Sequence, residues 1–194
     1  MASSNLRLHY FIPFSRSNGP GSRAVIWVQG CSLGCSGCFN PETQSFKKGR
    51  LVSTDQLFER IIKLGHTIEG ITISGGEPLQ QMQPLLTLLR RIRKETNLSV
   101  LLFTGYSWEE IEEMKKSPEL LHYVDIFIAG RYDQTKKVGR NLLGSTNQTL
   151  HFLSGRYTKK DLKKTPPSEV SITREGKVIL TGIDPPNLFQ HDYK

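Results

Sequence analysis

Three cysteines within eight residues are the part of the sequence with the clearest chemistry. Cys31, Cys35 and Cys38 form a C-x3-C-x2-C run with glycines beside and between them. Thiolates this close together on one loop can bind a single metal centre, and soft sulfur ligands favour zinc, copper(I) or iron–sulfur clusters. Because three cysteines cannot pair completely into disulfides, the run indicates a metal centre.

The number of cysteines narrows the kind of centre. A structural zinc site needs four ligands, and the nearest histidines, His9 and His66, lie 22 residues before and 28 residues after the run. A four-iron cluster held by three cysteines keeps one iron without a protein ligand. A small molecule can bind and react at that iron, so the run favours a catalytic iron–sulfur cluster.

The elements around this loop are predicted to alternate between strands and helices. Apolar runs predict strands at residues 24–29, 70–74, 98–103 and 124–129. Helical spacing predicts helices at residues 54–64, 79–94 and 108–116. This alternation is typical of parallel βαβ units, whose ligands bind at the C-terminal ends of the strands.

Chemistry-bearing residues do follow the predicted strands. The cysteines follow the first, and Gly75-Gly76-Glu77-Pro78 follows the second. Thr104-Gly105-Tyr106 follows the third, and Gly130-Arg131 follows the fourth. We therefore expect these segments to meet at one edge of the sheet.

The composition limits the class of protein. A chain of 194 residues with 37% hydrophobic residues fits one globular domain. No apolar stretch approaches the roughly 20 residues of a membrane span, and residues 1–5 lack the features of a secretory signal, so a cytoplasmic protein with no membrane partner is expected. The net charge of +8 favours an anionic partner, but nucleic acid is not expected because no nucleic-acid-binding motif is present.

The sequence changes character beyond Gly155. Lysines become frequent, Pro166-Pro167 follows, and two short strand-like runs flank Glu175-Gly176. We predict a main domain over residues 1–152 and a basic C-terminal extension over residues 153–194 that contains a β-hairpin.

Several motifs occur together in a characteristic order. They are Asn18-Gly19-Pro20-Gly21, the cysteine run followed by Phe39-Asn40, Ser74-Gly75-Gly76-Glu77-Pro78-Leu79, Thr104-Gly105-Tyr106, Gly130-Arg131-Tyr132 and Gly144-Ser145-Thr146-Asn147-Gln148. The series resembles the radical S-adenosylmethionine (SAM) superfamily. Within it, the series resembles the activating enzymes of glycyl-radical enzymes, and most closely those of anaerobic ribonucleoside-triphosphate reductase.

This resemblance implies an activity and its partners. Cys31, Cys35 and Cys38 would hold three irons of a [4Fe–4S] cluster, and SAM would bind the fourth. Reduction of SAM by a flavodoxin- or ferredoxin-type donor would give a 5′-deoxyadenosyl radical. That radical would remove a hydrogen atom from a glycine Cα of the partner enzyme.

The resemblance also implies a set of residues that contact SAM. They are Phe39, Ser74, Gly75, Gly76, Glu77, Thr104, Tyr106 and Asn147. The glycines would let the backbone approach the ligand, and Glu77 would accept a hydrogen bond from the SAM ammonium group. Thr104 and Tyr106 could meet the ribose or adenine, although a capping threonine and a packed tyrosine explain them equally well. Arg131 could face the SAM carboxylate or be a surface cation.

The expected fold is an α/β architecture in the form of an open, partial βα barrel. About 150 residues are too few for the closed eight-stranded barrel of about 250 residues. The open side would admit the polypeptide loop that carries the target glycine.

Two alternative functions remain at the level of sequence. One is a radical SAM enzyme acting alone on another substrate, a possibility raised by the extension after Leu153. The other is a zinc-binding or iron–sulfur electron-transfer module whose basic tail binds nucleic acid.

Overall fold

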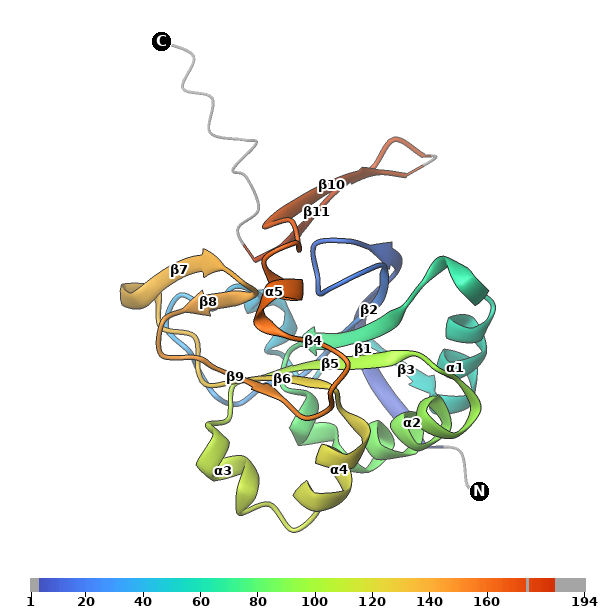
Figure 1. Ribbon diagram of the computed structural model, residues 1–194, viewed down its shortest axis with the longest axis horizontal. Helices are drawn as coiled ribbons and strands as arrows, with labels where there is room; N and C mark the ends of the chain where they lie inside the picture. Colours follow the sequence, from blue (N-terminus) through green and yellow to red (C-terminus); the bar gives the residue numbers. More distant parts are fainter. Residues whose placement is uncertain (1–3, 174, 184–194) are drawn as a thin grey trace.

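A mixed seven-stranded sheet forms the centre of the molecule. The computed structural model describes residues 4–173 and 175–183 (Figure 1). The strand order is β3-β1-β2-β4-β5-β6-β9. The adjacent strands β2, β4, β5 and β6 are parallel, whereas β1, β3 and β9 pair antiparallel with their neighbours. The predicted α/β class with a parallel-rich sheet is confirmed.

The bounds of the elements are as follows. The strands of the sheet are β1 (Asn5–Ser15), β2 (Arg23–Val28), β3 (Arg50–Ser53), β4 (Gly70–Gly75), β5 (Ser99–Thr104), β6 (Ile126–Ala129) and β9 (Thr149–Phe152). The helices are α1 (Thr54–Ile62), α2 (Met82–Glu95), α3 (Trp108–Glu112), α4 (Ser117–Tyr123) and α5 (Lys159–Leu162), with 3-10 turns η1 (Pro41–Thr43), η2 (Gly65–Thr67), η3 (Pro78–Gln81) and η4 (Gln134–Lys136). Two smaller antiparallel pairs are β7 (Lys137–Arg140) with β8 (Leu143–Ser145), and β10 (Ser168–Ile172) with β11 (Val178–Gly182).

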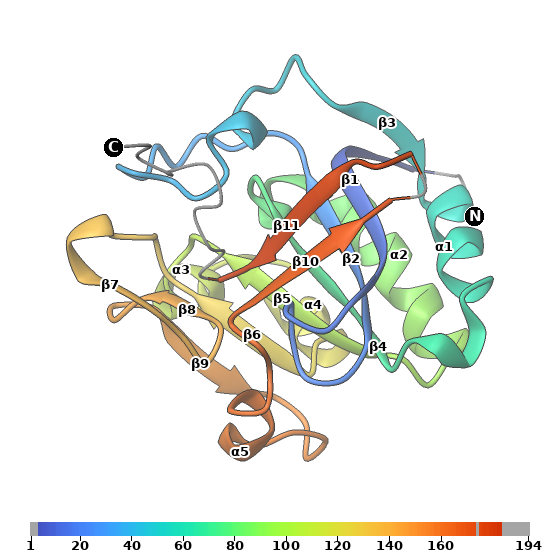
Figure 2. The same cartoon turned by 90° about the horizontal axis from the view of Figure 1, so that it is seen from above.

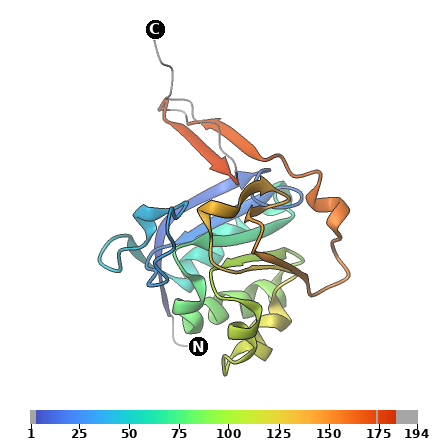
Figure 3. The same cartoon turned by 90° about the vertical axis from the view of Figure 1, so that its left-hand side faces the viewer.

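The parallel strands read as continuous apolar runs because both faces of the sheet are covered. Alternate residues, such as Ile26 and Leu102, join the core beneath α1, α2, α3 and α4. Residues of β5 and β6 that point to the other face, such as Leu101 and Ile128, join a second core with Leu162 of α5. Figures 1 and 3 show α1–α4 on one side of the sheet and the β10–β11 pair on the other. We call this pair the C-terminal hairpin.

Local sequence signals explain where the helices begin. The Ser53 side chain accepts a hydrogen bond from the Gln56 N–H at 3.1 Å and caps α1. The turn η3 precedes α2, so Pro84 falls in the first turn of α2, where its missing N–H costs nothing. The helix predicted over residues 108–116 is wrong in its extent, because α3 ends at Glu112 and a separate helix, α4, begins at Ser117. In the described part of the chain, no helix has both the length and the apolar character needed to span a bilayer.

The strand β1 is absent from the sequence-based prediction. It runs antiparallel to β2 on one side and to β3 on the other. Leu6, Leu8 and Ile12 are buried, whereas the residues between them face outward or lie half-buried. The alternation over residues 5–8 has the period of a strand with one buried face, and it is the signal that could have found β1, although a register shift between Leu8 and Tyr10 interrupts it.

A fully buried arginine joins the first three parallel strands. The Arg23 side chain donates hydrogen bonds to Thr72 Oγ1 at 2.7 Å, to the Ile71 carbonyl at 2.6 Å and to Ser99 Oγ at 3.0 Å. Burial lowers the pKa of Arg23, and the neighbouring Tyr157 opposes this effect. The guanidinium on β2 therefore acts as a clamp that links β2 to β4 and β5 through hydrogen bonds to uncharged oxygens.

Removing this clamp should destabilise the fold. We expect Arg23→Ala to lower the free energy of unfolding by about 3 kcal/mol, because buried acceptors on β4 and β5 lose their donor. For a chain of this size that corresponds to a fall in Tm of about 6–12 °C, which thermal unfolding would measure. Arg50→Ala, at an exposed position on β3, is the control. A fall in Tm no larger than that of the control would contradict this role for Arg23.

Candidate functional site

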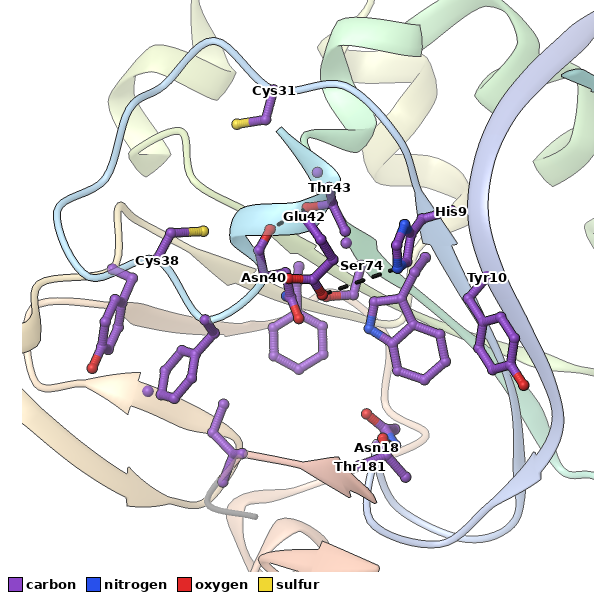
Figure 4. Close-up of a pocket in the computed structure, with 18 of the residues that line it drawn as sticks. His9, Tyr10, Asn18, Cys31, Cys38, Asn40, Glu42, Thr43, Ser74 and Thr181 are labelled. Atoms are coloured by element: carbon purple, nitrogen blue, oxygen red, sulfur yellow. Dashed lines mark hydrogen bonds and ion pairs between the residues drawn. The ribbon is translucent and has the colours of Figure 1, made fainter. Parts of the chain in front are cut away.

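A cavity of about 530 Å³ lies where the parallel strands end, bounded by the sheet, the cysteine loop and the C-terminal hairpin (Figure 4). It is lined by Cys31, Cys35, Cys38, Phe39, Ser74, Gly75, Gly76, Glu77, Thr104, Gly105, Gly130 and Gln148, by His9, Tyr10 and Ile12 of β1, by Trp27 of β2, and by residues 177–183, among others. The segments that follow four parallel strands therefore meet at one place, as the alternation of elements indicates.

The three cysteines lie on the loop after β2. Backbone hydrogen bonds from Gly30 to the Thr43 carbonyl at 2.7 Å and from Cys31 to the Gln44 carbonyl at 3.0 Å hold the two ends of the loop together. Gly34 and Gly37 adopt φ values of 63° and 68°, which let the chain turn sharply between the cysteines. All three thiols are free and half-buried. Cys31 and Cys38 lie on the same side of the cavity in Figure 4.

This arrangement fits a multi-iron cluster better than a single ion. Among the residues described, no three His, Cys, Asp or Glu side chains converge closely enough to hold one metal ion. The thiolates of a four-iron cluster bind different irons, so the body of the cluster keeps them apart. Three free thiols around one cavity can therefore bind three irons of an iron–sulfur cluster.

The pKa of Cys31 shows how the loop would respond to the positive charge of bound metal ions. Burial raises the pKa of the Cys31 thiol, and negative charge on Glu77, Cys35 and Cys38 adds to the effect, while a backbone hydrogen bond at Leu33 opposes it. Since thiols must lose their protons to bind metal, assembly of a cluster at this loop releases protons.

The glycine turn after β4 packs directly against the start of the cysteine loop. The Gly76 N–H donates to the Val28 carbonyl at 2.8 Å, and the Glu77 N–H donates to the Gly30 carbonyl at 2.9 Å. A Cβ at Gly76 would lie 2.4 Å from the Gly30 carbonyl oxygen. Only glycine permits this close approach of two backbones, and the approach fixes the position of Gly30, the residue just before Cys31.

Glu77 is a fully buried carboxylate at the centre of the site. Its Oε1 accepts hydrogen bonds from the Leu79 N–H and the Thr104 hydroxyl, and its Oε2 accepts one from the Gly105 N–H, each at 2.8 Å. Burial raises the pKa of Glu77 from its ordinary value of 4.5 to about 7, and the three donors oppose this shift. The side chain thus caps η3 and ties the end of β4 to the end of β5.

The structure brings most, but not all, of the residues expected at SAM into the cavity. Phe39, Ser74, Gly75, Gly76, Glu77 and Thr104 line it together with the three cysteines. Tyr106 and Asn147 are not among the lining residues, and their side chains have other partners. The Tyr106 hydroxyl accepts from Gln80 Nε2 at 3.1 Å, and Asn147 Nδ2 donates to the Arg131 carbonyl at 2.8 Å. Arg131 pairs with Glu110 at 2.7 Å and also lies outside the lining.

The cavity is also lined by residues that are not in the expected set of SAM contacts. The Gln148 amide oxygen accepts from the Gly144 N–H at 2.8 Å, and its nitrogen donates to the Gly130 carbonyl at 3.0 Å. On β1, His9 Nδ1 lies 2.9 Å from Gln29 Oε1 and His9 Nε2 lies 4.0 Å from a carboxylate oxygen of Glu42. The histidine reaches the cavity only through the antiparallel pairing of β1 with β2, which local sequence patterns do not reveal.

Substitution of the turn glycine should disturb the cysteine loop without removing any cysteine. We expect Gly76→Ala to reduce cluster content and SAM cleavage at least about tenfold, because its Cβ would collide with fixed backbone at Gly30. Iron analysis and release of 5′-deoxyadenosine would measure both effects. Gly155→Ala is the matched control, since a Cβ there meets open space. Equal activity of the two variants would contradict the positioning role of Gly76.

Comparison with known proteins identifies the family. Residues 17–151 match the family described as 4Fe-4S single cluster domain. The anaerobic ribonucleoside-triphosphate reductase-activating protein of Enterobacteria phage T4 is 36% identical over 69% of this chain and 85% of that protein. The protein of the same name from Vibrio cholerae is 30% identical over 75% of this chain and 97% of that protein.

Two further comparisons are less extensive. A putative glycyl-radical enzyme activating enzyme of Haemophilus influenzae is 40% identical over 45% of this chain and 34% of that protein. The crystal structure of QueE from Escherichia coli aligns with 53% of each chain at a TM-score of 0.46 and 20% identity. The family matched over residues 17–151, together with the two longer relatives, confirms the resemblance carried by the cysteine run and Gly75-Gly76-Glu77-Pro78. The chain belongs to the 4Fe-4S single cluster domain family, among the anaerobic ribonucleoside-triphosphate reductase-activating proteins.

Proposed function

We propose that this protein is a radical SAM enzyme that activates a glycyl-radical enzyme, namely an anaerobic ribonucleoside-triphosphate reductase. The observation that carries the proposal is one cavity that joins three free cysteines to the glycine turn and the buried carboxylate at the ends of neighbouring parallel strands. Cys31, Cys35 and Cys38 would bind three irons of the cluster. The fourth iron would be left to the amino and carboxylate groups of SAM.

The chemistry comes from the bound groups, and the chain positions them. When bound, the cluster and SAM supply, after one-electron reduction by an external donor, methionine and a 5′-deoxyadenosyl radical that takes a hydrogen atom from a glycine Cα. Gly75 and Gly76 keep the turn after β4 packed against β2 and the start of the cysteine loop, beside the space for SAM, because a Cβ at either would collide with the backbone of Val28 or Gly30. Glu77 holds the Gly105 N–H and the Thr104 hydroxyl in fixed positions around that space.

SAM would contact residues on four segments of the chain. Besides the glycine turn and Thr104, we assign Phe39 to this role, because its ring lies at the cavity 4.3 Å from the Tyr132 ring. Glu77 would accept from the SAM ammonium group through lone pairs left over by its three protein donors. Contacts from Tyr106 and Asn147 would need their side chains to leave their present partners.

The finer architecture and the partners follow from the same assignment. In this proposal the sheet is the open, partial βα barrel of radical SAM enzymes, formed by residues 1–152, with residues 153–194 as a basic extension. A flavodoxin- or ferredoxin-type protein in the cytoplasm would donate the electron, and the net charge of +8 would steer such an acidic donor towards the surface.

The proposal is tested by the radical it produces. Protein reconstituted with iron and sulfide, reduced with dithionite and mixed with SAM and the reductase of the same organism should generate a glycine-centred EPR signal on the reductase. Omitting SAM is the control and should leave no signal. Release of 5′-deoxyadenosine without a radical on the reductase would instead favour an enzyme that acts alone on another substrate.

A further inference from the structure

The C-terminal hairpin forms one wall of the cavity. Residues 177–183 line the cavity, and they lie outside residues 17–151, the part of the chain that matches the family. Figure 2 shows the hairpin crossing above the sheet, with β11 nearer than β10 to the light-blue segment that follows β2. In Figure 4, Thr181 of β11 lies across the cavity from Cys31. The site thus includes a wall that the matched family domain does not contain.

Polar contacts fix this wall against the sheet. Glu169 of β10 accepts hydrogen bonds from the Ser15 hydroxyl at 2.7 Å and from the Arg16 N–H at 3.0 Å. Thr181 of β11 accepts one from Asn18 Nδ2 at 2.6 Å. Glu169 and Thr181 are cross-strand partners, so both strands of the hairpin are attached to residues 15–18 at the same point along the hairpin. The hairpin is therefore a fixed part of the cavity.

The hairpin turns an edge, and not a face, towards the cavity. Seven consecutive residues, 177–183, line the cavity, whereas none of the residues of β10 does. A strand that presented one face would contribute only alternate residues. The cavity is therefore bordered by the edge of β11 that points away from β10.

The backbone groups on that edge have no partner within the described chain. The Thr173 N–H bonds to the Lys177 carbonyl, and the Ile183 N–H bonds to the Pro167 carbonyl. In an antiparallel ladder the bonded pairs alternate, so Ile179 and Thr181 bond to β10 while Val178 and Leu180 direct their N–H and C=O groups outward. Among the described residues, β11 has no strand neighbour other than β10.

An unpaired strand edge in a reaction cavity can recognise an extended polypeptide by strand addition. We propose that the outer edge of β11 binds the segment of the partner protein that carries the target glycine, as an added third strand. This inference rests on the proposed function, since only a polypeptide substrate has such a segment. The rings of Tyr10 and Trp27, with centroids 6.5 Å apart, line the same cavity and offer an apolar surface to the added strand.

Amide hydrogen exchange tests the proposal without altering the chain. The probe is a synthetic peptide that copies the glycine-radical segment of the reductase of the same organism, added to the cluster-loaded protein with SAM. Exchange at Val178 and Leu180 should slow at least about tenfold on binding, because their N–H groups become hydrogen-bonded. Exchange at Val170 and Ile172, on the opposite edge of the hairpin, should not change. Unchanged exchange at Val178 and Leu180 with saturating peptide would overturn the proposal.

Proline substitution provides a matched pair of variants. Leu180→Pro removes an outward N–H on the cavity edge, and Val170→Pro removes the equivalent outward N–H of its cross-strand partner on the opposite edge. We expect Leu180→Pro to weaken peptide binding about tenfold or more and Val170→Pro to leave it unchanged. Leu180→Ala, which keeps the N–H, should lose less affinity than Leu180→Pro. Equal peptide affinity of the two proline variants would overturn the proposal.

Two controls separate the possible failures. Exchange protection at Ile179 and Thr181 reports whether the ladder with β10 survives the substitution, and Val178→Pro tests the same edge if Leu180→Pro disrupts it. If sedimentation shows that Leu180→Pro abolishes self-association but not peptide binding, the edge pairs with a second copy and the proposal fails. Release of 5′-deoxyadenosine and formation of the glycyl radical by the unaltered protein test the proposed function separately.

Discussion

Replacing any one of Cys31, Cys35 and Cys38 with alanine is expected to reduce 5′-deoxyadenosine release to background. Each thiol is free and lines the same cavity, so each would bind one iron of the cluster. A cluster that binds the chain through two thiolates would have two irons without protein ligands and would be lost readily. Iron content and the brown absorbance of the reconstituted protein should fall together with SAM cleavage.

The control for this series lies in the same loop. Ser36→Ala changes an exposed side chain between Cys35 and Cys38 whose hydroxyl accepts a hydrogen bond from Gln134 Nε2 at 3.3 Å. It should retain iron and activity. An alanine variant of a cysteine with the iron content and SAM cleavage of Ser36→Ala would show that this cysteine is not a ligand.

The stability of the protein should depend on pH through Glu77. Burial raises the pKa of Glu77 from 4.5 to about 7 in the folded state. The folded protein therefore holds a proton that the unfolded chain has already lost between these two values, so the free energy of unfolding falls as pH rises from about 4.5 to about 7. The shift corresponds to about 3 kcal/mol, an order-of-magnitude figure for a fully buried group.

Glu77→Gln should remove this dependence, because the amide does not titrate. The amide has a single acceptor oxygen and its nitrogen only donates, so either the Leu79 N–H or the Gly105 N–H would lose its acceptor, and the variant should also be less stable than the parent near pH 5. Denaturant unfolding at several pH values, without SAM, would measure both effects. Glu59→Gln makes the same change at an exposed position of α1 and should keep the parent's pH profile. A Glu77→Gln profile that still falls between pH 4.5 and 7 would contradict the buried titration.

The sequence predicts the parallel part of the fold because the signals are local. Residues such as Ile26, Ile71 and Leu102 lie in short apolar runs bounded by glycine or polar residues, and burial on both faces produces such runs. The cysteine spacing and the Gly75-Gly76 turn are local in the same way. The pairing that brings them together follows from the rule that parallel strands present their C-terminal ends at one edge.

The rest of the site depends on long-range contacts that no local pattern encodes. His9 reaches the cavity through antiparallel pairing of β1, and Thr181 reaches it through a hydrogen bond to Asn18, a residue 163 positions earlier. Asn147 and Gln148 are adjacent amides, yet only Gln148 lines the cavity, because its side chain bonds to the Gly130 carbonyl. The geometry of the turn, and not the residue types, decides which of these two neighbouring amides faces the cavity.

In the proposed function, the three cysteines leave one iron of the cluster open to SAM. The most direct measurement is the EPR spectrum of the dithionite-reduced, reconstituted protein before and after addition of SAM. Coordination of SAM to the open iron should change the g values and line shape of the reduced cluster. A spectrum that is identical with and without SAM would contradict coordination of SAM by the cluster.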